Sequence, residues 1–132
     1  MANDPLFIVL CSPEHEKLQM AGMMASVGAV SERPVKLFVS MNAIFAFEKD
    51  ISDEKRYQGG RFSKLMLEKN APDAINLLRQ GKELGDLEVY ACSMALDVSG
   101  IGEGDLVEDL FDGALGLTKF LSDAEAGQLV FI

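Results

Sequence analysis

Short apolar runs recur along this chain at the spacing expected of alternating strands and helices. A continuous apolar run occupies 5–11, and a run of this length bounded by turn residues is typical of a strand buried on both faces. Largely apolar runs at 35–40, 87–92 and 129–132 predict three more strands. A shorter apolar stretch at 113–115 indicates a further, brief strand. The pattern therefore predicts five strands.

Segments with helical character lie between these runs. Ser12 suits the N-cap position and Pro13 the first helical position, so we expect a helix to begin there and to run to about Gly28. A second helix is expected over 73–84, between a proline that precedes it and a glycine that closes it. Shorter helices are expected at 41–47 (as a helix or a turn), 105–111 and 117–126.

The segment 49–70 breaks this regular pattern. It is polar, and a loop of this length is usually functional or mobile. Apolar positions near its end predict that its second half packs as a short helix. The 132 residues contain no linker and no internal repeat, so we expect a single domain over 1–132.

Strands and helices alternate over the whole chain, and this order is typical of an α/β fold. The alternation predicts a mostly parallel sheet of five strands with helices on both faces. We expect the flavodoxin-like strand order 2-1-3-4-5, in which the first and third strands are neighbours. In open parallel sheets, ligands bind beyond the carboxyl ends of the strands, so a site is expected at that edge.

The charge balance and the hydropathy exclude two classes of partner. Asp and Glu number 21 against 12 Lys and Arg, which gives a net charge of −9. Nucleic-acid binding needs clustered Lys and Arg, and no run of four basic residues occurs, so no nucleic acid is expected. No apolar run approaches the roughly 20 residues that a helix needs to span a bilayer, so no membrane segment is expected.

The N-terminus and the cysteine count indicate a cytoplasmic protein with free thiols. Residues 1–5 have neither a basic region nor a long apolar region, so they do not resemble a signal peptide. Two cysteines in an unexported chain are expected to be free thiols. A structural zinc site needs about four ligands, and two cysteines with the single histidine, His15, do not reach that number. We expect neither a metal nor another cofactor.

The carboxyl ends of the predicted strands bring sulfur-bearing and polar residues to one edge. The first strand ends at Cys11 and the third at Cys92, so both thiols fall where a site is expected. In the expected strand order these two strands are neighbours, which would bring the thiols close together. The candidate ligand contacts at the same edge are Ser12, Ser40, Asn42, Ser93 and Met94.

Cys92 is the residue on which chemistry is expected to centre. A turn or helix start in the residues that follow would point backbone N–H groups at the sulfur and favour the thiolate. The thiolate is the form that attacks sulfur or carries it. A cysteine at a strand end is equally well explained as a small buried apolar residue, and position alone does not separate the two interpretations.

Three further residues are candidate accessory groups. Cys11 completes an apolar strand, so it suits the core as well as a site. His15 lies one turn further on, where it would act as a base or proton shuttle or else lie exposed in a first helical turn. Asp97 would orient the loop after Cys92 or else be an ordinary exposed carboxylate.

Residues 90–101, Tyr-Ala-Cys-Ser-Met-Ala-Leu-Asp-Val-Ser-Gly-Ile, resemble the DsrE/DsrF-like family of sulfur-relay proteins. Within them, the pattern Ala-Cys-x-Met-x-x-Asp-x-x-Gly-Ile resembles the branch often labelled peroxiredoxin-like or DsrE-like. The resemblance extends to 35–47 and 106–132 and is poorest over 49–70. It implies a three-layer αβα sandwich with five parallel strands, and a homo-oligomer, commonly a trimer or a hexamer.

The resemblance also implies a function. In sulfur-relay members the cysteine after the third strand takes up a persulfide and passes it on, and that cysteine is here Cys92. The chain is thus expected to be a persulfide carrier or sulfurtransferase-like protein, with sulfur donor and acceptor proteins or small thiols as partners. Two alternatives stay open: a non-catalytic oligomeric binding or assembly module of the same fold, and a small-molecule binder at the carboxyl edge of the sheet.

Overall fold

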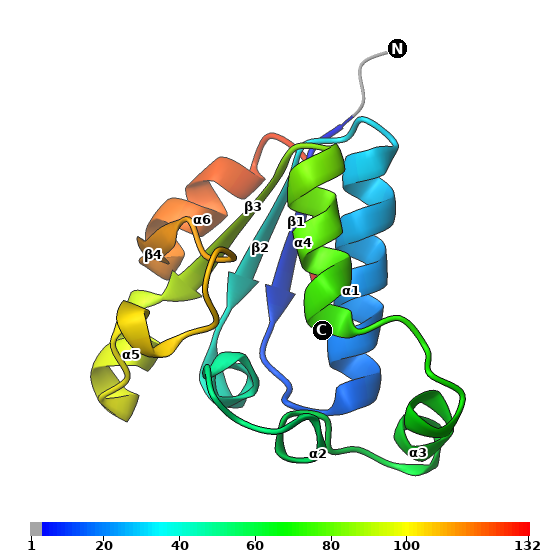
Figure 1. The fold of residues 1–132 in the computed structure, drawn as a ribbon. Helices are drawn as coiled ribbons and strands as arrows, with labels where there is room; N and C mark the ends of the chain where they lie inside the picture. Colours follow the sequence, from blue (N-terminus) through cyan, green and yellow to red (C-terminus); the bar gives the residue numbers. More distant parts are fainter. Residues whose placement is uncertain (1–3) are drawn as a thin grey trace.

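The fold is built on a parallel sheet of five strands (Figure 1). The computed structural model describes residues 4–132, so the first three residues of the N-terminal segment considered above lie outside it. The strands are β1 (Leu6–Leu10), β2 (Val35–Val39), β3 (Leu87–Cys92), β4 (Gly113–Leu115) and β5 (Gln128–Phe131). All five strands expected from the apolar runs are confirmed, and each boundary lies within one residue of the prediction.

The strand order differs from the 2-1-3-4-5 order that we expected. The observed order is β4-β3-β2-β1-β5, with every neighbouring pair parallel. β2 lies between β1 and β3, so that Phe38 pairs with Val9 on one side and with Tyr90 on the other. Apolar runs predict which residues form strands but not which strands pair, because all inner strands of such a sheet are buried on both faces.

The direction of each crossover decides which face a helix covers. α1 (His15–Val30) connects β1 to β2, and α4 (Ala74–Leu84) connects β2 to β3 in the same direction, so right-handed crossovers put both helices on one face (Figure 1). Their close approach depends on Gly22, where an added Cβ would lie 3.0 Å from the carbonyl oxygen of Ala74.

Among the described residues, no helix has both the length and the apolar character needed to cross a membrane.

α6 (Leu117–Ala124) covers the opposite face, because it connects β4 back across the sheet to β5. Phe120 is its anchor and is fully buried. The centroid of its ring lies 5.6 Å from that of Phe7 in β1 and 4.9 Å from that of Phe38 in β2. With helices on both faces of a parallel five-stranded sheet, the expected αβα sandwich is confirmed.

Short helices surround the carboxyl edge of the sheet. They are η1 (Met41–Phe47), α2 (Asp53–Arg56), α3 (Arg61–Glu68), α5 (Ser93–Ser99) and η2 (Glu103–Asp105). α3 confirms the short helix expected in the second half of the 49–70 segment. Arg56 is buried, and its guanidinium donates hydrogen bonds to the carbonyl oxygens of Ala46 and Glu48 at 2.6 and 2.8 Å. This contact ties the 49–70 segment to η1.

Two helix predictions need correction. The helix expected to begin after Ser12 begins at His15, and the Ser12 hydroxyl instead accepts a hydrogen bond from the backbone N–H two residues on. The helix expected over 105–111 does not form. The backbone N–H of Val107 donates instead to the carbonyl oxygen of Phe47 in η1. Pairing with a distant segment therefore replaces the local helix there.

Candidate functional site

The carboxyl ends of β1, β2 and β3 lie at one edge of the sheet, as their parallel arrangement requires. Figure 1 shows the arrowheads of these strands pointing to the end of the molecule where α2, α3 and α5 lie. Cys11, Ser40 and Cys92 follow or end the three strands, so all of them lie at this edge. The two cysteines are not on neighbouring strands, because β2 separates them.

Cys92 is the last residue of β3 and the N-cap residue of α5, so a helix begins directly after it, as expected. Its side chain makes no capping hydrogen bond to the backbone of α5. Only 4% of the residue is exposed, and it belongs to the hydrophobic core, in register with Leu115 of β4. The thiol thus lies at a helix start and is also covered by the core.

The motif around Cys92 forms the turn from β3 into α5. Ala95 and Leu96 are buried and anchor this short helix, whereas Met94 is 48% exposed. Gly100 closes the helix with a φ of 76°, a left-handed conformation that glycine adopts without steric cost. Asp97 is exposed and makes no hydrogen bond or ion pair with any residue of the described chain, so its orienting role stays a prediction.

Cys11 lies half-buried just beyond β1, where its backbone N–H donates to the carbonyl oxygen of Ile132 at 2.9 Å. Burial raises the pKa of its thiol, and the negative charge of a Cys92 thiolate raises it further. The two sulfurs are therefore close enough for their charges to interact, although β2 separates their strands. A raised pKa keeps Cys11 protonated at neutral pH, and a protonated thiol is a poor nucleophile.

The other residues predicted at this edge do not converge on one cavity. Asn42 is exposed and lines an open hollow of about 530 Å³ together with Phe45 and Lys55. Neither cysteine lines this hollow. Ser40 is buried at the end of β2, and Ser93 is half-buried in the first turn of α5. The edge therefore presents separate polar groups rather than one shaped ligand site.

His15 is buried at the start of α1, with 3% of the residue exposed. Its Nδ1 lies 2.8 Å from the hydroxyl oxygen of Ser63 in α3, and its ring stacks on Tyr57 with the centroids 4.5 Å apart. Within residues 4–132, no hydrogen bond or ring contact joins His15 to either cysteine. The structure thus places His15 against the 49–70 segment.

A cluster of polar contacts docks this segment on the first turn of α1, and our sequence reasoning did not find it. The Glu16 carboxylate accepts hydrogen bonds from the backbone N–H groups of Gly60 and Ser63 at 2.9 and 3.0 Å. Hydrogen bonds from the backbone N–H of Glu16 itself and from those of Ser63 and Gly60 stabilise the carboxylate, and they hold the pKa of Glu16 below its usual value. Glu16 and Gly60 are 44 positions apart, so only the length of the polar segment signalled a function here.

Protonation of His15 is expected to destabilise the fold in mild acid. Burial lowers the pKa of His15 below its ordinary value of 6.5, although nearby Glu16 and Asp73 oppose the shift. The unfolded chain therefore binds more protons in the window between the two pKa values. The stability due to the neutral imidazole is complete above about pH 6.5 and is lost as the pH falls through the folded pKa.

Urea unfolding of the wild type and of His15→Gln, at a series of pH values from about 7.5 to about 5, measures this effect. The wild type is expected to lose more of its free energy of unfolding over this range than the variant, which lacks the titrating group. Identical pH profiles for the two proteins would contradict the prediction.

Comparison with solved structures agrees with the fold described above. The protein of unknown function MTH1491 from Methanobacterium thermoautotrophicum superposes with a TM-score of 0.61 at 11% sequence identity. The alignment covers 99% of this chain and 100% of that protein. At this identity the likeness shows the fold alone.

Comparison of the sequence with known proteins gives a more specific result. A search of curated proteins found no match. Residues 6–132 match the DsrE/DsrF/DrsH-like family, and this range contains all five strands and both cysteines. The resemblance seen in the Cys92 motif therefore extends over nearly the whole chain, and the chain belongs to the DsrE/DsrF/DrsH-like family.

Proposed function

We propose that this protein carries sulfane sulfur as a persulfide on Cys92. Membership of the DsrE/DsrF/DrsH-like family supports a sulfur-relay-type role at the level of the family. The observation that carries the finer proposal is the position of Cys92, between the end of β3 and the start of α5 at the carboxyl edge of the sheet. The partners in this role are a sulfur donor and a sulfur acceptor, either proteins or small thiols.

The proposed transfer consists of two exchange steps at sulfur. The Cys92 thiolate attacks the outer sulfur of a donor persulfide, the S–S bond of the donor breaks, and the donor leaves as a thiolate. The outer sulfur stays on Cys92 as a persulfide. A thiolate of the acceptor then attacks this same sulfur and releases the Cys92 thiolate. Neither step needs an external oxidant or reductant, because each S–S bond that breaks is replaced by another.

The surroundings of the two thiols favour Cys92 over Cys11 as the carrier. The raised pKa of Cys11 disfavours its thiolate, which is the form that attacks sulfur. Cys11 also lies beyond the end of β1 without a helix beginning directly after it, since α1 begins at His15. We therefore assign the carrier role to Cys92 and treat Cys11 as an accessory residue.

The burial of Cys92 favours one alternative, a non-catalytic binding or assembly module that keeps the fold. In the relay, part of α5 must move to expose the sulfur to a donor. α5 has seven residues, and its anchors in the core are Ala95 and Leu96, whereas Val98 is 80% exposed. A short helix held by two buried side chains is suited to such local opening.

Alkylation with iodoacetamide at neutral pH, followed by mass spectrometry of the digested peptides, separates the relay from the binding module. A carrier thiol is expected to react in the folded protein and faster than Cys11, whose pKa is raised. The binding module is indicated instead if Cys92 is labelled only after the protein is unfolded in urea.

Exposed apolar side chains on the α6 side of the sheet support a homo-oligomer. Leu129 and Phe131 of β5 are 49% and 73% exposed, and Leu129 pairs with Phe7, whose side chain contacts α6. Leu117 and Leu121 of α6 itself are 48% and 42% exposed. Apolar surfaces of this kind commonly mark contacts between protein chains. We therefore retain the homo-oligomer, with a trimer or a hexamer favoured, as part of the proposal.

Leu121→Asp is expected to dissociate this oligomer, because a carboxylate would be buried without a partner at the interface. Sedimentation velocity measures the change in mass. Val27→Asp is the matched control, since Val27 is 64% exposed on α1, in the other helical layer. A wild-type chain that sediments as a monomer, or equal dissociation by both variants, would contradict the proposed interface.

A further inference from the structure

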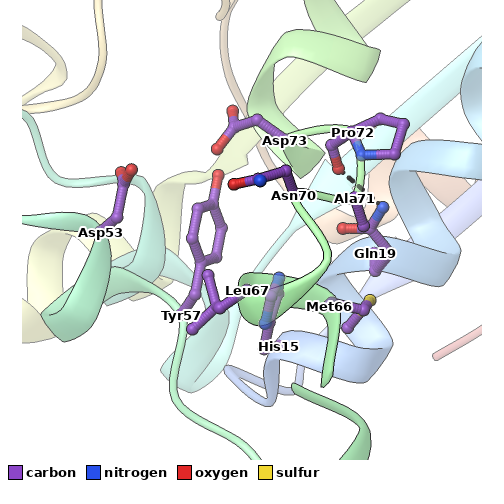
Figure 2. A pocket seen from close by; sticks show the side chains of 10 residues that line it. All are labelled: His15, Gln19, Asp53, Tyr57, Met66, Leu67, Asn70, Ala71, Pro72 and Asp73. Carbon is purple, nitrogen blue, oxygen red and sulfur yellow. Dashed lines mark hydrogen bonds between the residues drawn. The ribbon is translucent and has the colours of Figure 1, made fainter. Parts of the chain in front are cut away.

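A cavity of about 170 Å³ lies where the 49–70 segment meets α1 and α4 (Figure 2). Its walls come from the first turns of α1, from α2 and α3, and from the turn that leads into α4. Neither cysteine lines it. The cavity is therefore separate from the site proposed for sulfur transfer.

Two side chains that are at least nine-tenths buried present unpartnered polar atoms to this cavity. Gln19 is 5% exposed, and its Nε2 donates to the carbonyl oxygen of Pro72 at 2.8 Å. This bond fixes the orientation of the amide, so the free end is the carbonyl Oε1, an acceptor. Figure 2 shows this oxygen turned toward the space beside His15.

His15 is the second of these side chains. Ser63 occupies its Nδ1, and no residue in the described range forms a hydrogen bond with its Nε2, which faces the same space as the Gln19 oxygen (Figure 2). Because the Ser63 hydroxyl can donate or accept, the neutral imidazole is free to present Nε2 as an acceptor. Burial lowers the pKa of His15, so the ring does not oppose a cation at neutral pH.

The charged groups around the cavity are all acidic. Asp53 and Asp73 line it, and no Lys or Arg does. Asp73 caps α4 by accepting a hydrogen bond from the backbone N–H of Asn76 at 3.0 Å, so its carboxylate is held in place. The Asp53 carboxylate makes no hydrogen bond or ion pair with the described residues. The net charge of −9 adds long-range attraction for cations.

We propose that this cavity binds a small organic cation that carries an ammonium or guanidinium group. The Gln19 oxygen and His15 Nε2 accept N–H donors inside, and the carboxylates of Asp53 and Asp73 compensate the charge. The volume is below the roughly 300 Å³ at which drug-sized pockets begin, so the ligand is a compact amine and not a nucleotide or a peptide. The proposal does not depend on the chemistry of Cys92.

The single histidine of the chain makes a direct test practicable, because its ring proton Hε1 gives a single NMR signal. Titration with putrescine is expected to move this signal and to saturate. The probes 1,4-butanediol and succinate have similar chains with neutral and anionic ends, and at equal ionic strength they are expected to leave the signal in place. Equal shifts with all three probes, or no saturable shift with putrescine, would overturn the proposal.

Substitution of the carboxylates checks where the cation binds. Asp73→Asn keeps a good N-cap residue for α4 but removes the charge, and it is expected to weaken putrescine binding about tenfold. Glu83→Gln is the matched control: it removes one charge from an exposed position near the far end of α4 and is expected to leave the affinity unchanged. Equal affinities for the wild type, Asp73→Asn and Asp53→Asn would contradict binding in this cavity.

Cys92→Ser is expected to bind putrescine like the wild type, which separates this proposal from the sulfur relay.

Discussion

Cys92→Ser is expected to reduce persulfide loading to at most about a tenth of the wild-type level, because a serine hydroxyl is not an adequate nucleophile for sulfur. The wild-type protein is incubated with a small-molecule persulfide and then freed of the donor. Intact mass spectrometry is expected to show one additional sulfur per chain, and peptide mapping is expected to place it on Cys92. The serine variant retains the size of the side chain, so the fold is expected to survive.

Cys11→Ser is the matched control for this experiment. It removes the other thiol of the chain, whose raised pKa disfavours the thiolate, so loading on Cys92 is expected to persist. Loading that is lost in Cys11→Ser but kept in Cys92→Ser would reverse the assignment. Loading that is absent from the wild type would contradict the proposed carrier role.

Phe120→Ala is expected to lower the free energy of unfolding by about 3–5 kcal/mol. Phe120 has no exposed surface and is the residue through which α6 contacts the rings of both Phe7 and Phe38. Its truncation removes the buried apolar area of the ring and leaves a cavity between α6 and the sheet. A loss of this size is a large fraction of the roughly 5–15 kcal/mol by which domains are stable.

Urea unfolding followed by circular dichroism measures this loss. Leu121→Ala is the control, because the neighbouring Leu121 is 42% exposed and its truncation is expected to cost less than about 1 kcal/mol in the monomer. The comparison is made at a concentration where both proteins have the same oligomeric state, since association stabilises the folded form. A similar loss for the two variants would show that Phe120 is not the anchor of α6.

The sequence by itself determined the elements of this protein. The apolar runs predicted all five strands to within one residue. β1 is buried at all five of its positions, and a strand buried on both faces leaves a continuous apolar signal. The turn residues around α4 predicted its limits, since Pro72 and Gly85 lie just outside it. The motif around Cys92 predicted the family, which the match over residues 6–132 confirmed.

Tertiary structure decided how these elements pair and what lies near each site residue. β2 lies between β1 and β3, against the expected order, because the choice of strand partner depends on crossovers and not on local pattern. The segment expected as a helix over 105–111 pairs instead with η1, since a long-range hydrogen bond from Val107 replaces the local ones.

The same distinction holds for the functional residues. Sequence position placed Cys11, Cys92 and Ser40 at the carboxyl edge, because that edge follows directly from where parallel strands end. It did not place His15 against Ser63 and Tyr57, whose contacts join segments more than 40 positions apart. Local spacing thus determined which residues lie at the sheet edge, whereas the packing of the 49–70 segment on α1 decided which side chains surround the cavity beside His15.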